Sequence, residues 1–341
     1  MKERINWIDW AKAWCMTVVV FDHTPHDGSP FLLQFLAGTN LASFFFISGY
    51  LKKPSVPQKE SLRKYFYCLI IPYFIYNALS YPYWIGKTYI EQGECPALSD
   101  SMKPIIGTLL GQLDSNFSCQ LNGVTWFLLS LFIMHWITDV CNRQKNGKVY
   151  MLIISVIAMF IYGFNKYTHF APYLLFHGLV RCIPFFFLGN VIRQNEYLKE
   201  TNLKKDFIIG ISALTLSLIL FYWHINENII LVHILIYFIV CFFSVIAIIH
   251  LWRCADKFKS QIVTYISIGT MVIFGLHRIL IGIVDHLAEK MFQISDISYS
   301  TLYAIILTFG IELALLPIII YCKQYHPILL GKRNAPFTST T

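Results

Sequence analysis

The sequence has few charged residues. Asp, Glu, Lys and Arg make up 13% of the 341 residues, whereas 56% are hydrophobic and 16% aromatic; an ordinary soluble domain has roughly 25% charged residues. Apolar runs of about 18 to 22 residues recur along the chain, and each is long enough to cross a hydrocarbon layer about 30 Å thick. These features exclude a soluble globular domain and predict an all-α integral membrane protein.

The sequence also lacks any CxxC motif or metal-ligand spacing among its nine cysteines. We therefore predict no metal site and no redox chemistry. Most of the cysteines lie in apolar runs, where cysteine behaves as a small hydrophobic residue. Cys95 and Cys119 share one predicted outer loop, and the sequence leaves open whether they form a disulfide.

The apolar runs predict about ten transmembrane helices, at residues 8–24, 34–51, 65–85, 123–140, 149–164, 171–192, 206–223, 229–251, 262–282 and 301–322. If the N-terminus is cytoplasmic, 20 of the 27 Lys and Arg residues fall in cytoplasmic segments. The positive-inside rule therefore places both termini in the cytoplasm, with a membrane domain over residues 1–325 and a short cytoplasmic tail over 326–341. Topology and contact with membrane lipid account for the net charge of +8, so no nucleic-acid partner is predicted.

Ionisable residues inside the predicted helices are candidates for function, because such groups are costly in lipid. The first helix contains Asp9, Lys12 and His23. Lys12 and His23 share one helical face about 16 Å apart along the axis, and Asp9 lies about 40° off that face, where it can pair with Lys12. This arrangement suits a long anionic donor such as an acyl-CoA. The alternative is structural: Lys12 extends to the inner surface and His23 lies at the outer end of the helix.

Further intramembrane candidates are Arg181, His277, Arg278 and Glu312. Arg181 cannot lose its charge, so we expect it to line a polar cavity. His277 and Arg278 fit a place in the site, and they equally fit side chains that reach the surface near a helix end.

Several motifs resemble those of acyltransferase family 3, which includes membrane-bound O-acetyltransferases of bacterial surface polysaccharides. Asp9, Lys12 and His23 match the spacing of the family's first-helix pattern. The remaining similar segments follow in the family's order: FFFISGYL (44–51), the basic pair Arg63 and Lys64, IIPY (70–73), TWFLLSL (125–131), IPFFFLG (183–189) and FGLH (274–277). Taken alone, each phenylalanine run next to a glycine indicates close helix packing.

The resemblance implies an inner-membrane O-acetyltransferase that moves an acetyl group from cytoplasmic acetyl-CoA to a hydroxyl of a cell-envelope glycan or lipid-linked sugar. His23 would be the general base, acting directly or through an acylated intermediate. Lys12, Arg63 and Lys64 would bind the donor phosphates. Asp9, Arg181 and His277 would support them, with Asp9 orienting Lys12 and Arg181 either polarising the thioester or neutralising charge in the tunnel.

Two departures from the family pattern affect the donor site. The family usually has arginine where Lys12 stands, and it often has a second arginine three residues after the one at Arg63, where this chain has Phe66. The alternative function is a transporter or flippase of a sugar-containing or anionic molecule, because polar residues in a membrane tunnel serve translocation as well as catalysis. A transporter of that kind predicts an internal repeat, and we find none.

Overall fold

A computed structural model describes residues 4–27, 30–52, 57–168, 174–227, 229–293 and 298–332. These residues form helices and loops, with no β-strand beyond isolated bridges. The helices are α1 (Asn6–His23), α2 (Pro30–Tyr50), α3 (Gln58–Tyr65), α4 (Ile71–Gln92), α5 (Leu98–Leu109), α6 (Trp126–Asn142), α7 (Gly147–Thr168), α8 (Leu174–Gln194), α9 (Leu203–Asn226), α10 (Ile230–Cys254), α11 (Gln261–Ile268), α12 (Thr270–Phe292) and α13 (Thr301–Tyr325), with a π-helix η1 (Phe66–Ile70) and the 3-10 helices η2 (Gly123–Thr125) and η3 (Pro327–Leu330).

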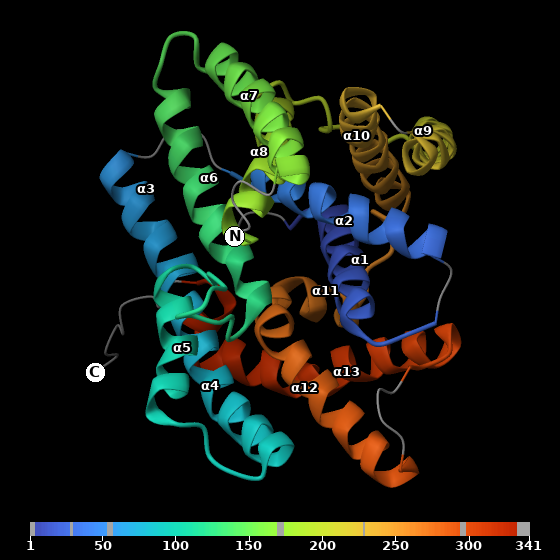
Figure 1. Cartoon of the computed structure of the whole chain (residues 1–341). Helices are drawn as coiled ribbons and strands as arrows, with labels where there is room; N and C mark the ends of the chain where they lie inside the picture. Colours follow the sequence, from blue (N-terminus) through green and yellow to red (C-terminus); the bar gives the residue numbers. More distant parts are fainter. Residues whose placement is uncertain are drawn as a thin grey trace, which may run out of the picture.

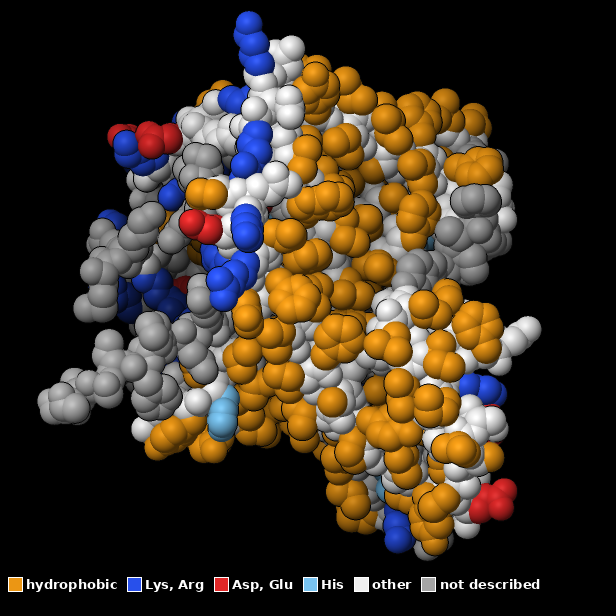
Figure 2. Space-filling view, turned by 90° about the vertical axis from the view of Figure 1, so that its left-hand side faces the viewer, with side chains coloured by type: hydrophobic (Ala, Val, Ile, Leu, Met, Phe, Trp, Pro, Cys, Tyr) orange, Lys and Arg blue, Asp and Glu red, His pale blue; other side chains and the backbone are white. Residues whose placement is uncertain are grey.

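Within the described residues, eight helices are long and apolar enough to cross a membrane, namely α2, α6 (with η2), α7, α8, α9, α10, α12 and α13. The predicted all-α, multi-pass membrane fold is therefore confirmed. Helices α1 and α4 have 18 and 22 residues but a more polar composition, so the total of ten spans and the cytoplasmic termini stay predictions. Figure 2 shows a broad apolar surface with Lys and Arg side chains gathered along one edge, as expected for a protein whose flank faces lipid.

Helices α1 and α2 occupy the centre of the molecule (Figure 1). Helix α1 contacts α2, α10, α11, α12 and α13, while α2 packs mainly on α8 and α10. Two groups of helices therefore meet at the centre: α7 to α10 on one side, and α4, α5, α12 and α13 on the other. Asp9, Lys12 and His23 of α1 lie buried or half-buried in this bundle, where partners from several helices can reach them.

Close approach of backbones joins α2 to α8. A Cβ atom at Gly49 would collide with the carbonyl of Phe186, and a Cβ atom at Gly189 would collide with the carbonyl of Phe46. Small residues of this kind allow two membrane helices to pack at short distance. The packing interpretation of both phenylalanine-rich motifs is thus confirmed.

Two predicted spans have different limits in the structure. The segment predicted at 65–85 begins in α3 and η1, and α4 continues to Gln92, where Gly93 with φ 76° ends it. The segment predicted at 262–282 is broken at Gly269 into α11 and α12, and α12 continues to Phe292. Hydropathy marks where lipid ends, whereas a helix ends only where its backbone is interrupted.

All nine cysteines are free, so Cys95 and Cys119 are not bonded to each other in this structure.

The described part of the predicted C-terminal tail packs on the bundle through η3, where the Tyr76 hydroxyl donates to the Leu329 carbonyl at 2.6 Å. Residues 333–341 lie outside the described residues.

Candidate active site

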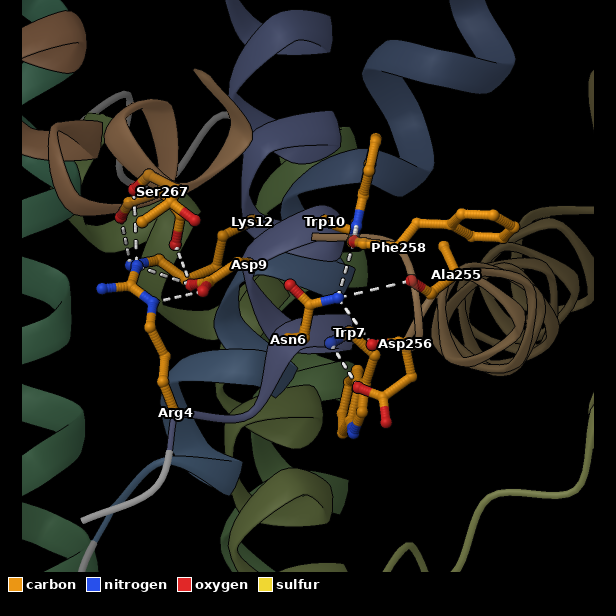
Figure 3. Close-up of polar contacts among 11 residues, drawn as sticks. Arg4, Asn6, Trp7, Asp9, Trp10, Lys12, Ala255, Asp256, Phe258 and Ser267 are labelled. Atoms are coloured by element: carbon orange, nitrogen blue, oxygen red, sulfur yellow. Dashed lines mark hydrogen bonds and ion pairs between the residues drawn. The ribbon is translucent and has the colours of Figure 1, made fainter. Parts of the chain in front are cut away.

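A polar cluster surrounds the first turns of α1, and its members Asp9 and Ser267 are buried (Figure 3). Arg4 donates to both carboxylate oxygens of Asp9, and the Ser267 hydroxyl donates to Asp9 Oδ1 at 2.6 Å. The Lys12 ammonium donates to the Ser267 carbonyl at 2.7 Å. Among the described residues the ion-pair partner of Asp9 is therefore Arg4, and the predicted direct pairing with Lys12 is not formed. Ser267 contacts both residues and links Asp9 to Lys12.

The break between α11 and α12 explains the position of Lys12. Helix α11 ends at Ile268, so the Ser267 carbonyl lies in the last turn and has no partner within the helix. The C-terminal end of a helix carries partial negative charge, which favours an ammonium group. A continuous helix over 262–282, as the sequence predicted, would have left Lys12 without this acceptor.

The start of α1 is fixed to the loop between α10 and α11 (Figure 3). The Asn6 side-chain amide donates to the Asp256 and Phe258 carbonyls at 2.6 and 2.8 Å, and the Trp10 indole donates to the Phe258 carbonyl at 2.8 Å. The Trp7 backbone N–H donates to the Asp256 carboxylate at 2.8 Å. These contacts hold the N-terminal end of α1 at one wall of a cavity.

This cavity is here called the inner cavity, because it lies at the end of α1 that is predicted to face the cytoplasm. It has a volume of about 970 Å³ and carries basic side chains, with Arg4, Asp9, Lys199, Asp256, Lys259, Tyr265 and Lys323 among its lining residues. Four cations face two carboxylates, and Arg4 already pairs with Asp9. Beyond the membrane segments, partial burial and the neighbouring Arg4 and Lys323 lower the pKa of Lys332. The crowding of cations makes this region suited to a polyanion such as the phosphates of a coenzyme.

The opposite end of α1 brings two histidines together. His23 Nδ1 lies 2.7 Å from the Val19 carbonyl, and His277 Nδ1 lies 2.8 Å from the Ile273 carbonyl. Because a carbonyl only accepts, Nδ1 carries the proton in each ring, and Nε2 of the neutral imidazole keeps its lone pair. The ring centroids are 5.0 Å apart with the planes at 73°. His277 is completely buried, and its Nε2 has no hydrogen-bond partner among the described residues.

His23 lines a second, outer cavity of about 440 Å³, with His277 packed behind it. Asn122 and Ser80 contribute polar groups to its wall, and the Asn122 amide donates to the Ser80 hydroxyl and the Gly275 carbonyl, each at 2.9 Å. The Asn122 Oδ1 atom is buried and, among the described residues, has no donor. Within the described ranges, Asn122 Oδ1 and His277 Nε2 are thus two acceptors that lack a donor.

A buried network holds the loop before α6 over the outer cavity. Gln112 is fully buried, with φ 71°, and its amide donates to Asn77 Oδ1 at 2.7 Å and to Thr125 Oγ1 at 3.1 Å. Its carbonyl oxygen accepts from the Leu121 backbone at 3.1 Å. Residues 120–123 consequently form a fixed wall of the cavity.

A comparison with protein families identifies the class of this chain. A family model described as an acyltransferase domain matches residues 5–321. The chain belongs to acyltransferase family 3. No curated protein and no solved structure gives a significant match. The family relationship supports a membrane acyltransferase, which favours acyl transfer over the transport alternative.

In this acyltransferase, Arg181 lies apart from both cavities. Its Nε donates to the Tyr237 hydroxyl, and its Nη2 donates to the Gly38 carbonyl at 2.7 Å. It joins α8 to α2 and α10 and lines neither the inner nor the outer cavity. The role of Arg181 toward a thioester stays a prediction.

Arg63 and Lys64 lie on α3, exposed, with Arg63 near the Tyr67 ring and Lys64 near the Tyr65 ring. Neither lines the inner cavity. Their role in donor binding stays a prediction. Arg4, Lys259 and Lys323 line the inner cavity but were not among the residues predicted from the sequence, because no motif singled them out and they served only as topology signals.

Proposed function

We propose that this acyltransferase moves an acetyl group from acetyl-CoA to a hydroxyl of a cell-envelope glycan or lipid-linked sugar in the inner membrane. The observation that carries the proposal is the position of two cavities at the two ends of α1. The basic inner cavity adjoins Arg4 and Asp9, and the outer cavity adjoins His23. A donor with charged phosphates and a distant reactive group fits this separation.

In this proposal Arg4, Lys259 and Lys323 hold the donor phosphates at the inner cavity, with Lys12 deeper along α1. Phosphate oxygens accept charge-assisted hydrogen bonds from such groups. Arg63 and Lys64 provide a second basic surface on α3, which guides the donor from solution. Asp9 positions Lys12 indirectly, because it fixes Ser267.

At the outer cavity the His23 Nε2 lone pair accepts the proton of the acceptor hydroxyl. The hydroxyl oxygen then forms a bond with the thioester carbonyl carbon, and the carbon–sulfur bond breaks. The His23 imidazolium returns its proton to the departing thiolate, so the products are an acetyl ester and free coenzyme A. General base catalysis of this kind contributes typically 10²- to 10⁴-fold in rate. His277 supports His23 by packing against its ring.

The proposal is tested with the purified full-length protein in proteoliposomes supplied with acetyl-CoA labelled in the acetyl group. Label should appear as an alkali-labile ester in a glycan extract of the source envelope. Coenzyme A should be released in equal amount. A transporter would instead move a labelled substrate across the bilayer without forming the ester, and that result would contradict the proposed function.

A further inference from the structure

The outer cavity adjoins a third cavity, of about 640 Å³, which lies farther along α4 and α12. Tyr83, Lys87, Gly282 and Asp285 line both cavities. His23 lines the outer cavity, and the third cavity extends away from His23. This third cavity, here called the outer cleft, has no part in the acyl-transfer chemistry described above.

The walls of the outer cleft do not favour an anionic ligand. Its carboxylates are Glu91, Asp285 and Glu289. Its basic side chains are His286 and Lys87, and Lys87 pairs with Glu91 at 3.5 Å. A phosphate or pyrophosphate would meet repulsion from these carboxylates. Carboxylates only accept hydrogen bonds, so they match a ligand that is rich in hydroxyl groups.

Aromatic rings complete the match to a sugar. Trp84 lines the outer cavity and stacks on Tyr81, with ring centroids 6.1 Å apart and planes at 17°. Tyr83 lines both cavities. A sugar ring presents C–H groups on its face and hydroxyls around its edge. Aromatic surface beside a few fixed acceptors is the composition that binds such a molecule.

The residues at the junction of the cavities are held in place. The Tyr299 hydroxyl donates to Asp285 Oδ1 at 3.0 Å. Tyr299 is itself joined to the loop after α1, because its carbonyl accepts from Asp27 N–H at 3.0 Å and its N–H donates to the Pro25 carbonyl at 3.2 Å. Pro25 also lines the outer cavity. The same loop therefore links His23 to Asp285.

We infer that the outer cleft is a second acceptor subsite, which favours an acceptor of at least two sugar units. One unit lies in the outer cavity beside His23, and the next lies in the outer cleft against Asp285. This inference rests on the proposed function and adds to it a subsite that selects the length of the acceptor. Asp285 acts here as a specificity residue and takes no part in proton transfer.

The test measures binding separately from transfer. The full-length protein in nanodiscs is incubated without donor with labelled methyl glycosides of one or two units, built from glucose, galactose, mannose or N-acetylglucosamine. We expect at least one disaccharide to bind about tenfold more tightly than its monosaccharide. Asp285→Asn should remove most of that difference, because it replaces a charged acceptor with a neutral one.

Two control variants separate recognition from structure. Tyr299→Phe removes the hydrogen bond to Asp285 but keeps the carboxylate, so the preference for disaccharides should remain. Asp100→Asn makes the same chemical change on α5, where Asp100 pairs with Lys103 at 2.7 Å outside both cavities, and should have no effect.

The outcomes are distinguishable. Equal binding of one and two units, absence of binding by every glycoside, or equal losses in Asp285→Asn and Tyr299→Phe would overturn the subsite. A disaccharide preference that depends on Asp285 supports the subsite even if no acetyl group is transferred, and in that case only the proposed function fails.

Discussion

Replacing Lys259 and Lys323 together with glutamine should weaken acetyl-CoA binding. Both side chains are exposed and line the inner cavity, with Lys323 5.0 Å from the Tyr265 ring centre. An exposed cation–anion contact is worth about 0.2 to 1 kcal/mol. Loss of two such contacts amounts to about 0.4 to 2 kcal/mol, so the apparent donor KM should rise about 2- to 30-fold.

The assay is acetyl transfer in proteoliposomes at several acetyl-CoA and salt concentrations. The wild-type KM should rise with salt, and the double variant should show a weaker dependence, because fewer charged contacts remain to be screened. Lys204→Gln with Lys205→Gln is the matched control, since both lysines are exposed at the start of α9 and do not line the cavity.

Arg63→Gln with Lys64→Gln distinguishes the two proposed donor surfaces. If the inner cavity holds the phosphates, this α3 pair should change the KM less than the Lys259 and Lys323 pair. An unchanged KM for Lys259 and Lys323, together with a large increase for Arg63 and Lys64, would refute the placement of the donor.

Three further predictions concern other parts of the molecule. Lys12→Ala should raise the donor KM while Lys12→Arg retains much of the activity, as measured by the same transfer assay. Gly189→Ala should lower the free energy of unfolding by about 1 to 3 kcal/mol, because its Cβ atom would collide with the Phe46 carbonyl. Gly86→Ala is the control and should not lower it, because its Cβ atom would meet no atom within 4 Å. Thermal denaturation in detergent compares the two variants, and equal stability would count against the packing. Accessibility tags after residues 145 and 257 should report the cytoplasm and a tag at 95 the outside, and a reversal would contradict the charge rule.

The fold was predictable because its signals are local. Apolar runs marked the membrane segments, and the phenylalanine-rich motifs around Gly49 and Gly189 indicated the close packing that joins α2 to α8. The ends of the helices were harder to predict, because Gly93 and Gly269 interrupt the helical backbone at points that hydropathy does not mark.

The candidate site was predictable only in part, because it depends on contacts across the chain. The spacing of Lys12 and His23 placed them at opposite ends of one helix. No sequence pattern showed that Ser267 would accept from Lys12 or that His277 would pack on His23. Nor did any pattern show that Arg181, which we expected to line a polar cavity, would donate to a hydroxyl of α10 and a carbonyl of α2.

The central claim is that His23 is the general base at the outer cavity. Acetyl transfer by the His23→Ala variant in proteoliposomes tests it most directly, with His326→Ala beyond α13 as the control histidine. We predict that kcat falls about 10²- to 10⁴-fold while the donor KM stays near wild type, because the imidazole acts mainly in the transition state. Full transfer activity in His23→Ala would contradict the mechanism.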